Sequence, residues 1–507
     1  MRGLRLRSRN RISALAGRSS HAYDLWIARD EPAAIAAQKR WKEPAILVVV
    51  DCQEGAGGLD DTLASIVQAG SAHEPILIGA AAAGEQACIE HASDLSPTID
   101  PRGSWLCVIS AGDRLARGAL EIYSAAAADA DRSCLIYSDD DLIGVDGSRS
   151  APQFKPCWNP ELFESHDYIS GSAIVKADAM TVAALPKRHW ASALIKTALN
   201  CPGKPIHLPV VLHHRRTRPA PKVPARPSQP LPDNPPSVTV IVPTRNHVQL
   251  LRTCIDGVRR TEYPAIETIV IDNGSDDPET IDFLQGLDTA GTRVLRIAGP
   301  FNYSALNNTA VAVAGGEVLC FLNNDIEMIA GDWLSMMVRQ ALRADIGAVG
   351  ARLLYRDGTV QHAGVYTGIG GGAGHAHRYQ DAEATGYFER ARLPQRISAV
   401  TGACLVVAKE KFLAVGGFDE KNFPVAFNDV DLCLKLNARG WQSFYEPRAT
   451  LIHHESKSRG SDSAKGNRAR FADELAALKR IWATDIQRDP YHHPHLSPFC
   501  EQFLISV

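Results

Sequence analysis

The sequence lacks the charge imbalance that proteins binding nucleic acid usually show. Its 507 residues carry 54 Lys and Arg against 57 Asp and Glu, which gives a formal net charge of −3. A protein that neutralises many phosphates needs an excess of basic residues, and this composition has none. Hydrophobic residues make up 45% and charged residues 22% of the chain, as in globular domains. A chain of this length is expected to form two or three such domains.

Paired cysteines and long apolar runs are also missing. The eleven cysteines never form a Cys-x-x-Cys pair, and no uncharged apolar run approaches the roughly 18 residues that cross a bilayer. Scattered cysteines in an odd number favour reduced thiols. We therefore expect a cytoplasmic protein that is soluble or lies peripherally at the inner membrane face. The first 20 residues hold six arginines and no acid, which is typical of a lipid-contacting segment or of a frayed tail.

A proline-rich segment divides the chain into two halves. Prolines make up 8 of the 18 residues from Pro219 to Pro236, which predicts an extended linker. The expected organisation has five parts: a basic tail at 1–20, an α/β domain at 21–215, the linker at 216–236, a second α/β domain at 237–460 and a helical extension at 461–507.

Short apolar runs alternate with helical patterns after the linker. Runs with the length of a buried strand occur at 238–242, 268–271, 318–322 and 403–407. Between the first two, apolar residues recur at helical spacing, and Asp332 is placed to cap a further helix. This alternation predicts a Rossmann-like α/β fold with right-handed crossovers, a mainly parallel sheet and helices on both faces.

Four segments of the first half match segments of the second half in the same order. The pairs are 46–50 with 238–242, 106–113 with 319–326, 171–175 with 402–406, and 211–214 with 451–454. Colinear matches favour duplication over chance. Where the second half has Asn-Asn-Asp at 323–325, the first has Ser-Ala-Gly at 110–112, and the acidic segment 428–432 faces 190–194, which has no acid. The first half is therefore interpreted as a degenerate copy of the second.

Polar residues follow three of the expected strands. After the first comes Pro243-Thr-Arg-Asn246, after the second Asp272-Asn-Gly-Ser-Asp-Asp277, and after the third Asn323-Asn-Asp325. Ligands of open α/β sheets bind beyond the carboxyl ends of the strands. A carboxylate there can accept hydrogen bonds from a ribose or a base, or hold a divalent ion against phosphates. Each segment alone is compatible with an ordinary turn, but three in succession favour a binding site.

Two later segments also offer reactive groups, each with a structural alternative. Asn428 and Asp429 begin an expected helix, in which Asn428 caps the helix or Asp429 points into the cleft as a general base. His453-His454-Glu455 suits a transition metal, Mn²⁺ or Mg²⁺. Adjacent residues on a strand point to opposite faces, so at most one of the histidines can face a given ion. The glycine-rich segment 368–377 lacks the spacing of phosphate-binding loops and is interpreted as a mobile loop near the cleft or a plain surface loop.

Taken together, these residues resemble those of family 2 glycosyltransferases of the GT-A fold, which transfer a sugar from a nucleotide donor with inversion at the anomeric carbon. The resemblance runs from about residue 237 to about residue 498. It rests on the motifs at 238–246, 269–275, 299–308, 321–327, 399–404, 427–434 and 453–456. Similar members build bacterial cell-surface polysaccharides, and rhamnosyltransferases of O-antigen assembly are among them.

The resemblance implies roles for individual residues. Asp429 matches the catalytic base, Asp325 the last acid of the Asp-x-Asp metal motif, and Asp272 the aspartate that contacts the nucleotide base. Further nucleotide-sugar contacts are expected from Pro243, Thr244, Asn246, Asn302, Asn307, Asn323 and Asn324. Asn323 replaces the first acid of the metal motif, so binding of Mg²⁺ or Mn²⁺ is expected to depend also on a histidine such as His454.

The resemblance also implies a reaction and its partners. A hydroxyl of a glycan or of a lipid-linked acceptor would displace the nucleotide of a UDP- or dTDP-sugar directly. The Gln-x-x-Arg-Trp motif of processive synthases is absent, which favours the addition of one or few sugars per encounter. The alternatives are a non-catalytic sugar-nucleotide or glycan-binding scaffold, a dinucleotide-dependent oxidoreductase, and a bifunctional transferase with a second metal site at Asp139-Asp-Asp141. An oxidoreductase would need a Gly-x-Gly-x-x-Gly turn after a strand, which the chain lacks, and acidic runs such as 139–141 are usually solvated loops.

Overall fold

The computed structural model describes residues 15–79, 88–225, 231, 234–289, 292–454 and 467–507. The chain divides into two compact units. The first comprises residues 1–220 with 493–497 and 504–507, and the second comprises residues 221–492 with 498–503. The boundary near residue 220 falls inside the segment predicted as a linker. Of the predicted tail, only residues 15–20 lie among the described residues.

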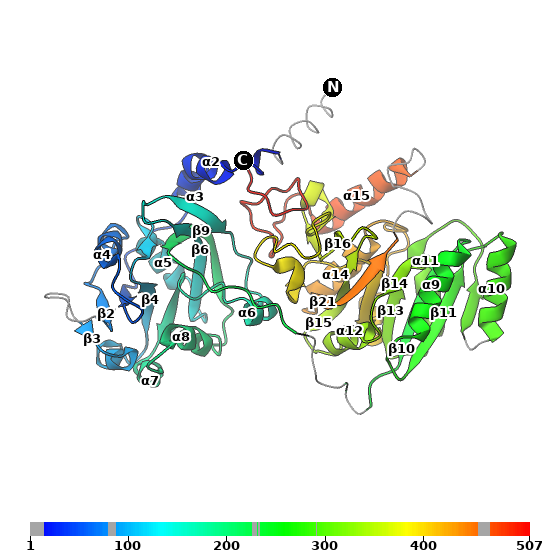
Figure 1. The fold of residues 1–507 in the computed structure, drawn as a ribbon, viewed down its shortest axis with the longest axis horizontal. Helices are drawn as coiled ribbons and strands as arrows, with labels where there is room; N and C mark the ends of the chain where they lie inside the picture. The colour runs from blue at the N-terminus through cyan, green and yellow to red at the C-terminus, as the bar shows by residue number, and fades with distance from the viewer. Residues whose placement is uncertain (1–14, 80–87, 226–230, 232–233, 290–291, 455–466) are drawn as a thin grey trace, which may run out of the picture. The chain divides into compact units, whose positions relative to one another are not determined.

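The second unit is built on a ten-stranded sheet with the order β12-β11-β10-β13-β20-β15-β21-β14 (Figure 1). Strand β16 pairs with β15, and β19 pairs with β21. The strands are β10 (Val238–Thr244), β11 (Ile266–Asp272), β12 (Arg293–Arg296), β13 (Val318–Leu322), β14 (Ile326–Met328), β15 (Ile346–Leu354), β16 (Val360–His362), β19 (Gln395–Ile397), β20 (Cys404–Ala408) and β21 (Gln442–His453). A separate hairpin joins β17 (Val365–Thr367) and β18 (Ala373–His375).

The described helices of the second unit include the predicted one between the first two strands and the predicted one that begins after Asp332, although the Asp332 side chain forms no capping hydrogen bond. They are α9 (Val248–Arg259), α10 (Pro278–Thr289), α11 (Tyr303–Val313), α12 (Trp333–Ala341), α13 (Lys409–Ala414), α14 (Asn428–Ala438) and α15 (Arg468–Trp482). The sheet is parallel from β12 to β13, but β20 runs antiparallel to both of its neighbours. The predicted mainly parallel order therefore holds for the first four strands. The pattern of apolar runs sets no direction for a strand that returns after a long connection, as β20 does.

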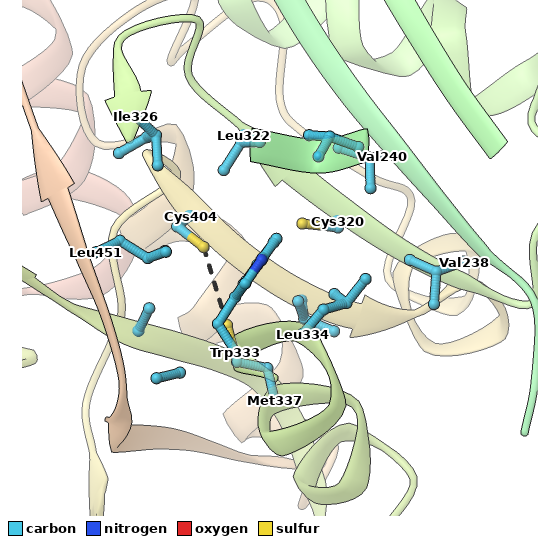
Figure 2. Close-up of a cluster of buried hydrophobic side chains, with 14 of the residues drawn as sticks. Val238, Val240, Cys320, Leu322, Ile326, Trp333, Leu334, Met337, Cys404 and Leu451 are labelled. Carbon is cyan, nitrogen blue, oxygen red and sulfur yellow. Dashed lines mark hydrogen bonds between the residues drawn. The ribbon is translucent and has the colours of Figure 1, made fainter. Parts of the chain in front are cut away.

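Different helices cover the two faces of this sheet. Neighbouring residues of a strand point to opposite faces, so they pack against different helices. Cys320 of β13 belongs to the core that α9 and α12 close, where Trp333 and Met337 are fully buried. Figure 2 shows this core, in which Cys404 approaches Met337 at 3.9 Å between the sulfur atoms. Phe321, the next residue of β13, packs instead against Phe412 of α13 on the other face. Each fully buried side chain of this size stabilises the fold by about 1.5–3 kcal/mol.

The described part of the first unit has the same order of eight strands with a ninth paired at the same place, but no counterpart of β19. Its order is β3-β2-β1-β4-β8-β6-β9-β5, with β7 paired to β6. The strands are β1 (Ile46–Asp51), β2 (Ile76–Ile78), β3 (Cys88–Ile89), β4 (Ser104–Ser110), β5 (Arg114–Leu115), β6 (Leu135–Ile143), β7 (Arg149–Gln153), β8 (Ala173–Ala177) and β9 (Ile206–Arg215). The helices are α2 (Ala22–Arg29), α3 (Glu31–Ala36), α4 (Leu59–Gln68), α5 (Ala119–Ala128), α6 (Pro160–Ser165), α7 (Ala179–Ala183) and α8 (Trp190–Ala198). The predicted α/β class and the preceding degenerate copy are thus confirmed.

Strand pairing corrects the residue alignment of the two halves at one end. The first two predicted matches keep their register, since β1 pairs β4 as β10 pairs β13. In the first unit Arg114 pairs with His214, and in the second Glu327 pairs with Ile452. Residue 214 therefore aligns with 452, two positions away from the predicted match, and Arg215 aligns with His453. The match of 171–175 with 402–406 is shifted by one residue in the same way.

A disulfide joins Cys134 to Cys201, with the Cα atoms 6.1 Å apart. The prediction of reduced thiols is wrong for this pair. Sixty-seven residues separate the two cysteines, and they meet because the backbone of Gly203 donates to Arg132 beside the start of β6. The spacing of the cysteines in the sequence contains no signal of this contact. The other nine cysteines form no disulfide with any described residue.

Among the described residues, no helix is both long and apolar enough to span a membrane.

Candidate active site

The carboxyl ends of β10 and β11 bring two predicted residues side by side. Thr244 and Asp272 are register partners in the sheet, and both are buried. Asp272 accepts a hydrogen bond from the backbone of Ser275 at 2.8 Å and lies 3.5 Å from Arg296. Thr244 accepts a hydrogen bond from the side-chain amide of Asn324 at 2.9 Å. This last contact ties the end of β10 to the segment that follows β13.

Two other predicted residues of this edge organise the loops. Asn246 has a left-handed backbone (φ 54°), and its side-chain oxygen accepts hydrogen bonds from the backbones of Asp276 and Asp277. Its own backbone donates to the Ser275 hydroxyl at 2.8 Å. Pro243 is buried within β10. The structure therefore gives Asn246 a role in holding the β10 and β11 loops together.

Helix α11 contributes the next two predicted residues, which differ in what they offer. Asn302 is the N-cap of α11 and accepts from the backbone of Ala305, while its amide donates to the Glu420 carbonyl. Asn307 is fully buried, and its amide donates to the Tyr303 carbonyl at 2.8 Å. Its side-chain oxygen receives no hydrogen bond from any described residue. Asn307 thus keeps an acceptor for a ligand, whereas Asn302 is committed to the helix end.

Asp325 lies directly after β13 and faces a histidine. The carboxylate is 4% exposed, and its Oδ1 lies 3.0 Å from Nε2 of His453 without receiving a hydrogen bond from any described residue. The other ring nitrogen, Nδ1, lies 2.9 Å from the side-chain oxygen of Gln361. Because that oxygen can only accept, it favours a ring proton on Nδ1, and in that tautomer the Nε2 lone pair points at the carboxylate. Two acceptors at this distance require a cation between them, either a proton or a metal ion.

The donor atoms at this point fit a divalent ion. Besides the carboxylate and the imidazole, the side-chain amide nitrogen of Asn323 lies 3.4 Å from the same ring nitrogen. A carboxylate and an imidazole together suit Mn²⁺ or Mg²⁺. The proton on Nδ1 of His453 also meets a requirement of metal-bound histidines, whose second ring nitrogen usually donates to an acceptor.

The histidine that lies next to Asp325 is His453 and not His454, which was expected from the sequence. Nε2 of His454 lies 2.8 Å from the carboxylate of Glu327, and its backbone donates to the carbonyl of Asp325. Strand β14 pairs with β21 so that Ile326 opposes His453. Because adjacent side chains of a strand point to opposite faces, this register turns His453 toward Asp325 and His454 away from it.

Asp429 is the second residue of α14 and is partly exposed. Its Oδ2 accepts from the backbone of Gly402 and its Oδ1 from that of Val430, both at 2.8 Å. The helix begins at Asn428 after Phe427, whose backbone is left-handed (φ 61°). The alternative that Asn428 caps the helix is therefore wrong, because Asn428 lies inside it. An anion at this helix end is stabilised by the helix dipole.

A short series of contacts joins the three carboxylates at one edge of the sheet. The backbone of Asn323 donates to the carbonyl of Ala403 at 2.9 Å, and the neighbouring Gly402 holds Asp429. The hydroxyl of Tyr303 donates to the Gly402 carbonyl at 2.8 Å, which fastens α11 to the same point. Asn324, between Asn323 and Asp325, reaches Thr244 and through it Asp272. The predicted residues Asp272, Asp325 and Asp429 therefore lie on connected segments at one edge of the sheet, where β11 and β13 end and β20 begins.

A buried histidine backs the segment that holds Asp429. Nδ1 of His362 lies 3.1 Å from Nδ1 of His375, and Nε2 accepts weakly from the backbone of Thr401. Burial, with His375 and His453 nearby, holds the pKa of His362 well below its ordinary value, so this ring is neutral. Sequence reasoning missed His362, Gln361 and Tyr303, since each acts through a partner far away in the chain.

The glycine-rich segment 368–377 is built into the fold. It contains a short 3₁₀ turn and β18. The backbone of Gly370 donates to Pro498 and that of His377 to Glu501, each at 2.8 Å. The interpretation as a mobile or plain surface loop is corrected, because part of the segment is a strand and hydrogen bonds to the C-terminal segment of the same unit hold it.

Comparison with known proteins identifies the second unit. Residues 239–411 match the family model described as "Glycosyl transferase family 2". This segment is a family 2 glycosyltransferase domain. The match covers the motifs that carry the resemblance as far as β20 and α13, and it confirms the predicted family.

Relatives extend over both units. An uncharacterized protein of Sinorhizobium fredii, y4gI, is 36% identical over 452 residues, which are 80% of this chain and 50% of that protein. The O-antigen biosynthesis protein RfbC of Myxococcus xanthus is 34% identical over 444 residues, 78% of this chain and 34% of that protein. An N-acetylglucosaminyl-diphospho-decaprenol L-rhamnosyltransferase of Mycobacterium tuberculosis is 45% identical over 65 residues, 13% of this chain and 21% of that protein. The chain spans a half and a third of the length of the first two relatives.

The first unit lacks every carboxylate of the family 2 domain's site. Ile78 pairs with Asp51 as Ile271 pairs with Pro243, so Gly79 takes the place of Asp272. Gly112 takes the place of Asp325 in the matched segments after β4 and β13. Helices α8 and α14 both begin after a left-handed residue, which puts Ala191 at the position of Asp429.

The chain itself fills these positions in the first unit. A Cβ atom added at Gly79 would lie 2.8 Å from Cγ of Gln53, and one added at Gly112 would lie 2.8 Å from the carbonyl oxygen of Gly57. Arg216 also lies against Gly112, and its guanidinium donates to the Gly112 carbonyl at 3.1 Å. Neither side chain of the family 2 site fits here without rearrangement of its neighbours.

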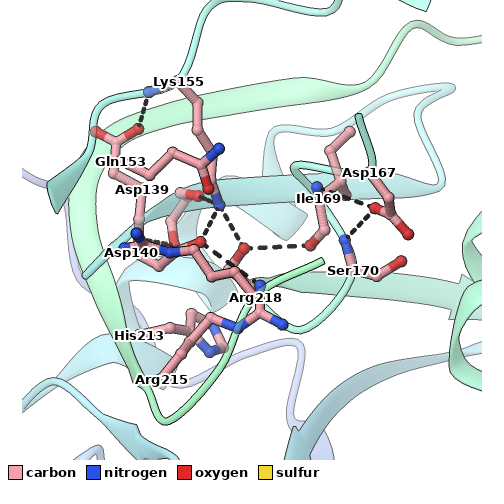
Figure 3. Close-up of polar contacts among 12 residues, drawn as sticks. Asp139, Asp140, Gln153, Lys155, Asp167, Ile169, Ser170, His213, Arg215 and Arg218 are labelled. Carbon is pink, nitrogen blue, oxygen red and sulfur yellow. Dashed lines mark hydrogen bonds and ion pairs between the residues drawn. The ribbon is translucent and has the colours of Figure 1, made fainter. Parts of the chain in front are cut away.

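The acidic run 139–141 is not a solvated loop. It lies in β6, and all three side chains are fully buried. Figure 3 shows Lys155, Arg215 and Arg218 gathered around Asp140. Lys155 Nζ lies 2.6 Å and Arg215 3.9 Å from this carboxylate, and Arg218 donates to it as well. The cations neutralise a buried charge, so this carboxylate is part of the core of the first unit.

Asp139 has a histidine on each oxygen, but this group does not fit a metal ion. Nε2 of His207 lies 2.8 Å and Nε2 of His493 2.7 Å from the carboxylate. Nδ1 of His493 accepts from the backbone of His495 at 3.1 Å, so the proton of this ring is on Nε2, where a metal would need a lone pair. Burial by itself raises the pKa of Asp139, but His493 and His207 hold it below the ordinary value. We therefore interpret the group as a hydrogen-bonded network of two histidine rings around a buried anion.

Loss of Asp140 should destabilise the chain. In Asp140→Ala the cation of Lys155 stays buried without its partner, and we expect a loss of about 3–5 kcal/mol in the free energy of unfolding. Asp129→Ala is the control, since it breaks an exposed pair with Lys39 that contributes at most about 1 kcal/mol. Urea denaturation of the full chain measures both, and equal midpoints for the two variants would contradict the interpretation of a buried ion cluster.

The two histidines can be told apart by metal binding. We expect His453→Ala to weaken Mn²⁺ binding by at least about tenfold, because it removes a donor next to Asp325, whereas His454→Ala changes it less than about threefold. Titration of the full chain followed by electron paramagnetic resonance of free Mn²⁺ gives the dissociation constants. A larger loss for the His454 variant would restore the choice made from the sequence.

Proposed function

We propose that the chain is an inverting glycosyltransferase, which moves a sugar from a nucleotide-diphosphate-sugar to a hydroxyl of a glycan or lipid-linked acceptor. One observation supports this most: in a family 2 domain, Asp429 and the Asp325–His453 pair lie at the same sheet edge. One group then removes a proton from the acceptor while the other serves the departing nucleotide. Inversion needs these two functions and no covalent intermediate.

Asp429 is the proposed general base. Backbone N–H groups of Gly402 and Val430 orient its carboxylate, and a carboxylate offers about four lone-pair positions. The acceptor hydroxyl gives its proton to Asp429 as its oxygen attacks the anomeric carbon from the face opposite to the nucleotide. General base catalysis of this kind contributes typically about 10²–10⁴-fold to the rate.

Asp325 and His453 would hold the divalent ion. When bound, the ion neutralises the charge that develops on the leaving diphosphate. The backbone carbonyl of Asp325 accepts a hydrogen bond from the His454 backbone, and the His453 ring contacts Gln361, so both residues have a defined position.

The nucleotide would be bound by acceptors on β10, β11 and α11. Asp272 and Thr244 lie at adjacent strand ends, and Asn307 carries a buried oxygen that receives no hydrogen bond from the described residues. Acceptors of this kind match the N–H and O–H groups of a base and a ribose. We propose UDP- or dTDP-sugars as donors, and Asn323 and Asn324 as further contacts to the bound nucleotide.

Surface-polysaccharide synthesis is the proposed setting. Its support is the likeness to an O-antigen biosynthesis protein over 444 residues and, over 65 residues, to an L-rhamnosyltransferase acting on a diphospho-decaprenol-linked sugar. A deoxyhexose such as rhamnose is then the first donor sugar to test. The reaction would take place at the cytoplasmic face of the membrane, where a lipid-linked acceptor is reached peripherally.

The bifunctional alternative finds no support in the first unit. Glycine or alanine stands at the positions of Asp272, Asp325 and Asp429, and neighbouring chain occupies the space at Gly79 and Gly112. The non-catalytic scaffold suits this unit better than the family 2 domain, which keeps all three carboxylates. We therefore propose one donor site per chain.

Replacement of the proposed general base, Asp429, should slow sugar transfer without weakening the binding of the nucleotide sugar. Asp429→Asn is expected to lower kcat by about 10²–10⁴-fold and to leave the affinity for the nucleotide sugar nearly unchanged. Transfer assays with dTDP- and UDP-sugars measure the rate, and calorimetry measures the affinity. Asp431→Asn, two residues further along the same helix, keeps an acceptor for the Trp482 indole and should retain most of the turnover. Undiminished transfer by the Asp429 variant would exclude its role as base.

Because the first unit lacks the site carboxylates, we expect one donor site per chain. Calorimetric titration of the full chain with a nucleotide sugar and Mn²⁺ should give one site per chain, and Asp272→Ala should abolish most of the heat. A second site that survives this substitution would show that the first unit binds nucleotide as well.

A further inference from the structure

Gln361 is a buried polar residue outside all the motifs of the family 2 domain. It lies on the short strand β16 and is 4% exposed. Burial of an amide is unfavourable unless it forms hydrogen bonds. Its side-chain oxygen meets Nδ1 of His453 at 2.9 Å, across 92 positions of sequence. This contact lies on the side of the ring opposite to Asp325.

We propose that Gln361 is a positioning residue, whose carbonyl oxygen holds the proton of His453 on Nδ1 so that Nε2 presents a lone pair to the cation site at Asp325. The inference rests on the proposed function, in which His453 and Asp325 hold a divalent ion. It adds that the binding of the ion depends on a residue that never touches it.

The alternative tautomer shows why an acceptor is needed behind the ring. With its proton on Nε2, His453 would donate to Asp325 across 3.0 Å and occupy the carboxylate. The same tautomer would turn the Nδ1 lone pair against the Gln361 oxygen at 2.9 Å, which is unfavourable. Gln361 therefore disfavours the proton arrangement that would close the cation site.

The histidine of the first unit supports this reasoning by contrast. Behind His493 stands a donor, the backbone N–H of His495, and the ring gives its Nε2 proton to the side of Asp139. Behind His453 stands an acceptor. The two histidine–carboxylate pairs have similar spacing, 2.7 and 3.0 Å, but only the pair with an acceptor behind the ring can take a metal ion.

Strand β16 places Gln361 accurately. The strand pairs with β15 through Leu353 and His362, and β15 lies beside β21, which carries His453. The backbone of the preceding residue, Val360, donates to Gln380 and accepts from Tyr379. These backbone hydrogen bonds hold the amide at a defined distance from the ring.

The test compares three substitutions in the full chain. Gln361→Leu removes the acceptor and keeps the shape, Gln361→Glu keeps an acceptor, and Gln340→Leu is the control on α12, where the lost amide faces Glu446 away from the site. Mn²⁺ affinity is measured by electron paramagnetic resonance, without any donor or acceptor. We expect Gln361→Leu to weaken binding by about 10–100-fold, as for other groups behind metal ligands, and the other two to stay within about threefold.

A second readout reports the tautomer itself. Nitrogen-15 chemical shifts of His453 in the metal-free wild-type chain should show the proton on Nδ1, and in Gln361→Leu a mixture of both forms. A wild-type ring with its proton on Nε2 overturns the inference, even if Gln361→Leu fails to fold.

The outcomes distinguish this inference from the proposed function. If His453→Ala weakens Mn²⁺ binding and Gln361→Leu does not, the metal site stands and the role of Gln361 is refuted. If neither His453→Ala nor Asp325→Asn changes the affinity, the proposed metal site itself fails. A loss of affinity in Gln361→Glu equal to that in Gln361→Leu would show that packing, not the acceptor, matters.

Discussion

The site of the family 2 domain depends on the contact between Asp325 and His453. The buried carboxylate and Nε2 of the ring lie 3.0 Å apart, so a proton or a metal ion between them stabilises the pair. The short pairing of β14 with β21 creates this contact, since it sets which face of the last strand looks at the end of β13. A shift of one residue in this register would exchange His453 for His454 and leave Asp325 beside a different group. The geometry proposed for sugar transfer therefore rests on three residues of strand pairing.

The two units show how one sheet can keep its architecture and lose its chemistry. Both have the same order of eight strands with a ninth paired at the same place. The apolar interior that specifies this order survives substitution as long as volume and pattern are kept. Side chains at the strand ends do not contribute to that interior, and here aspartates have given way to Gly79, Gly112 and Ala191. The first unit also buries charged residues within its sheet, where Lys155 and Asp140 form an ion pair. A scaffold role for this unit is consistent with both observations.

Uncharged residues support the functional groups of the family 2 domain. The Gly402 backbone orients Asp429, Tyr303 fastens Gly402, and Gln361 lies behind His453. None of these residues is charged, and each holds a functional group through a single hydrogen bond in a buried place. Such bonds are strong relative to their alternatives because an unpaired polar atom cannot turn to water.

The sequence by itself determined where the strands lie and which carboxylates follow them. Apolar runs such as 238–242 and 318–322 have the length of buried strands, and parallel strands bring the residues after them to one edge, so the meeting of Asp272 and Asp325 could be predicted. Only the tertiary structure decided that His453 and not His454 faces Asp325, that Cys134 reaches Cys201, and that the acids 139–141 are buried. Each of these depends on a pairing between segments far apart in the chain, and local patterns carry no information about such a register.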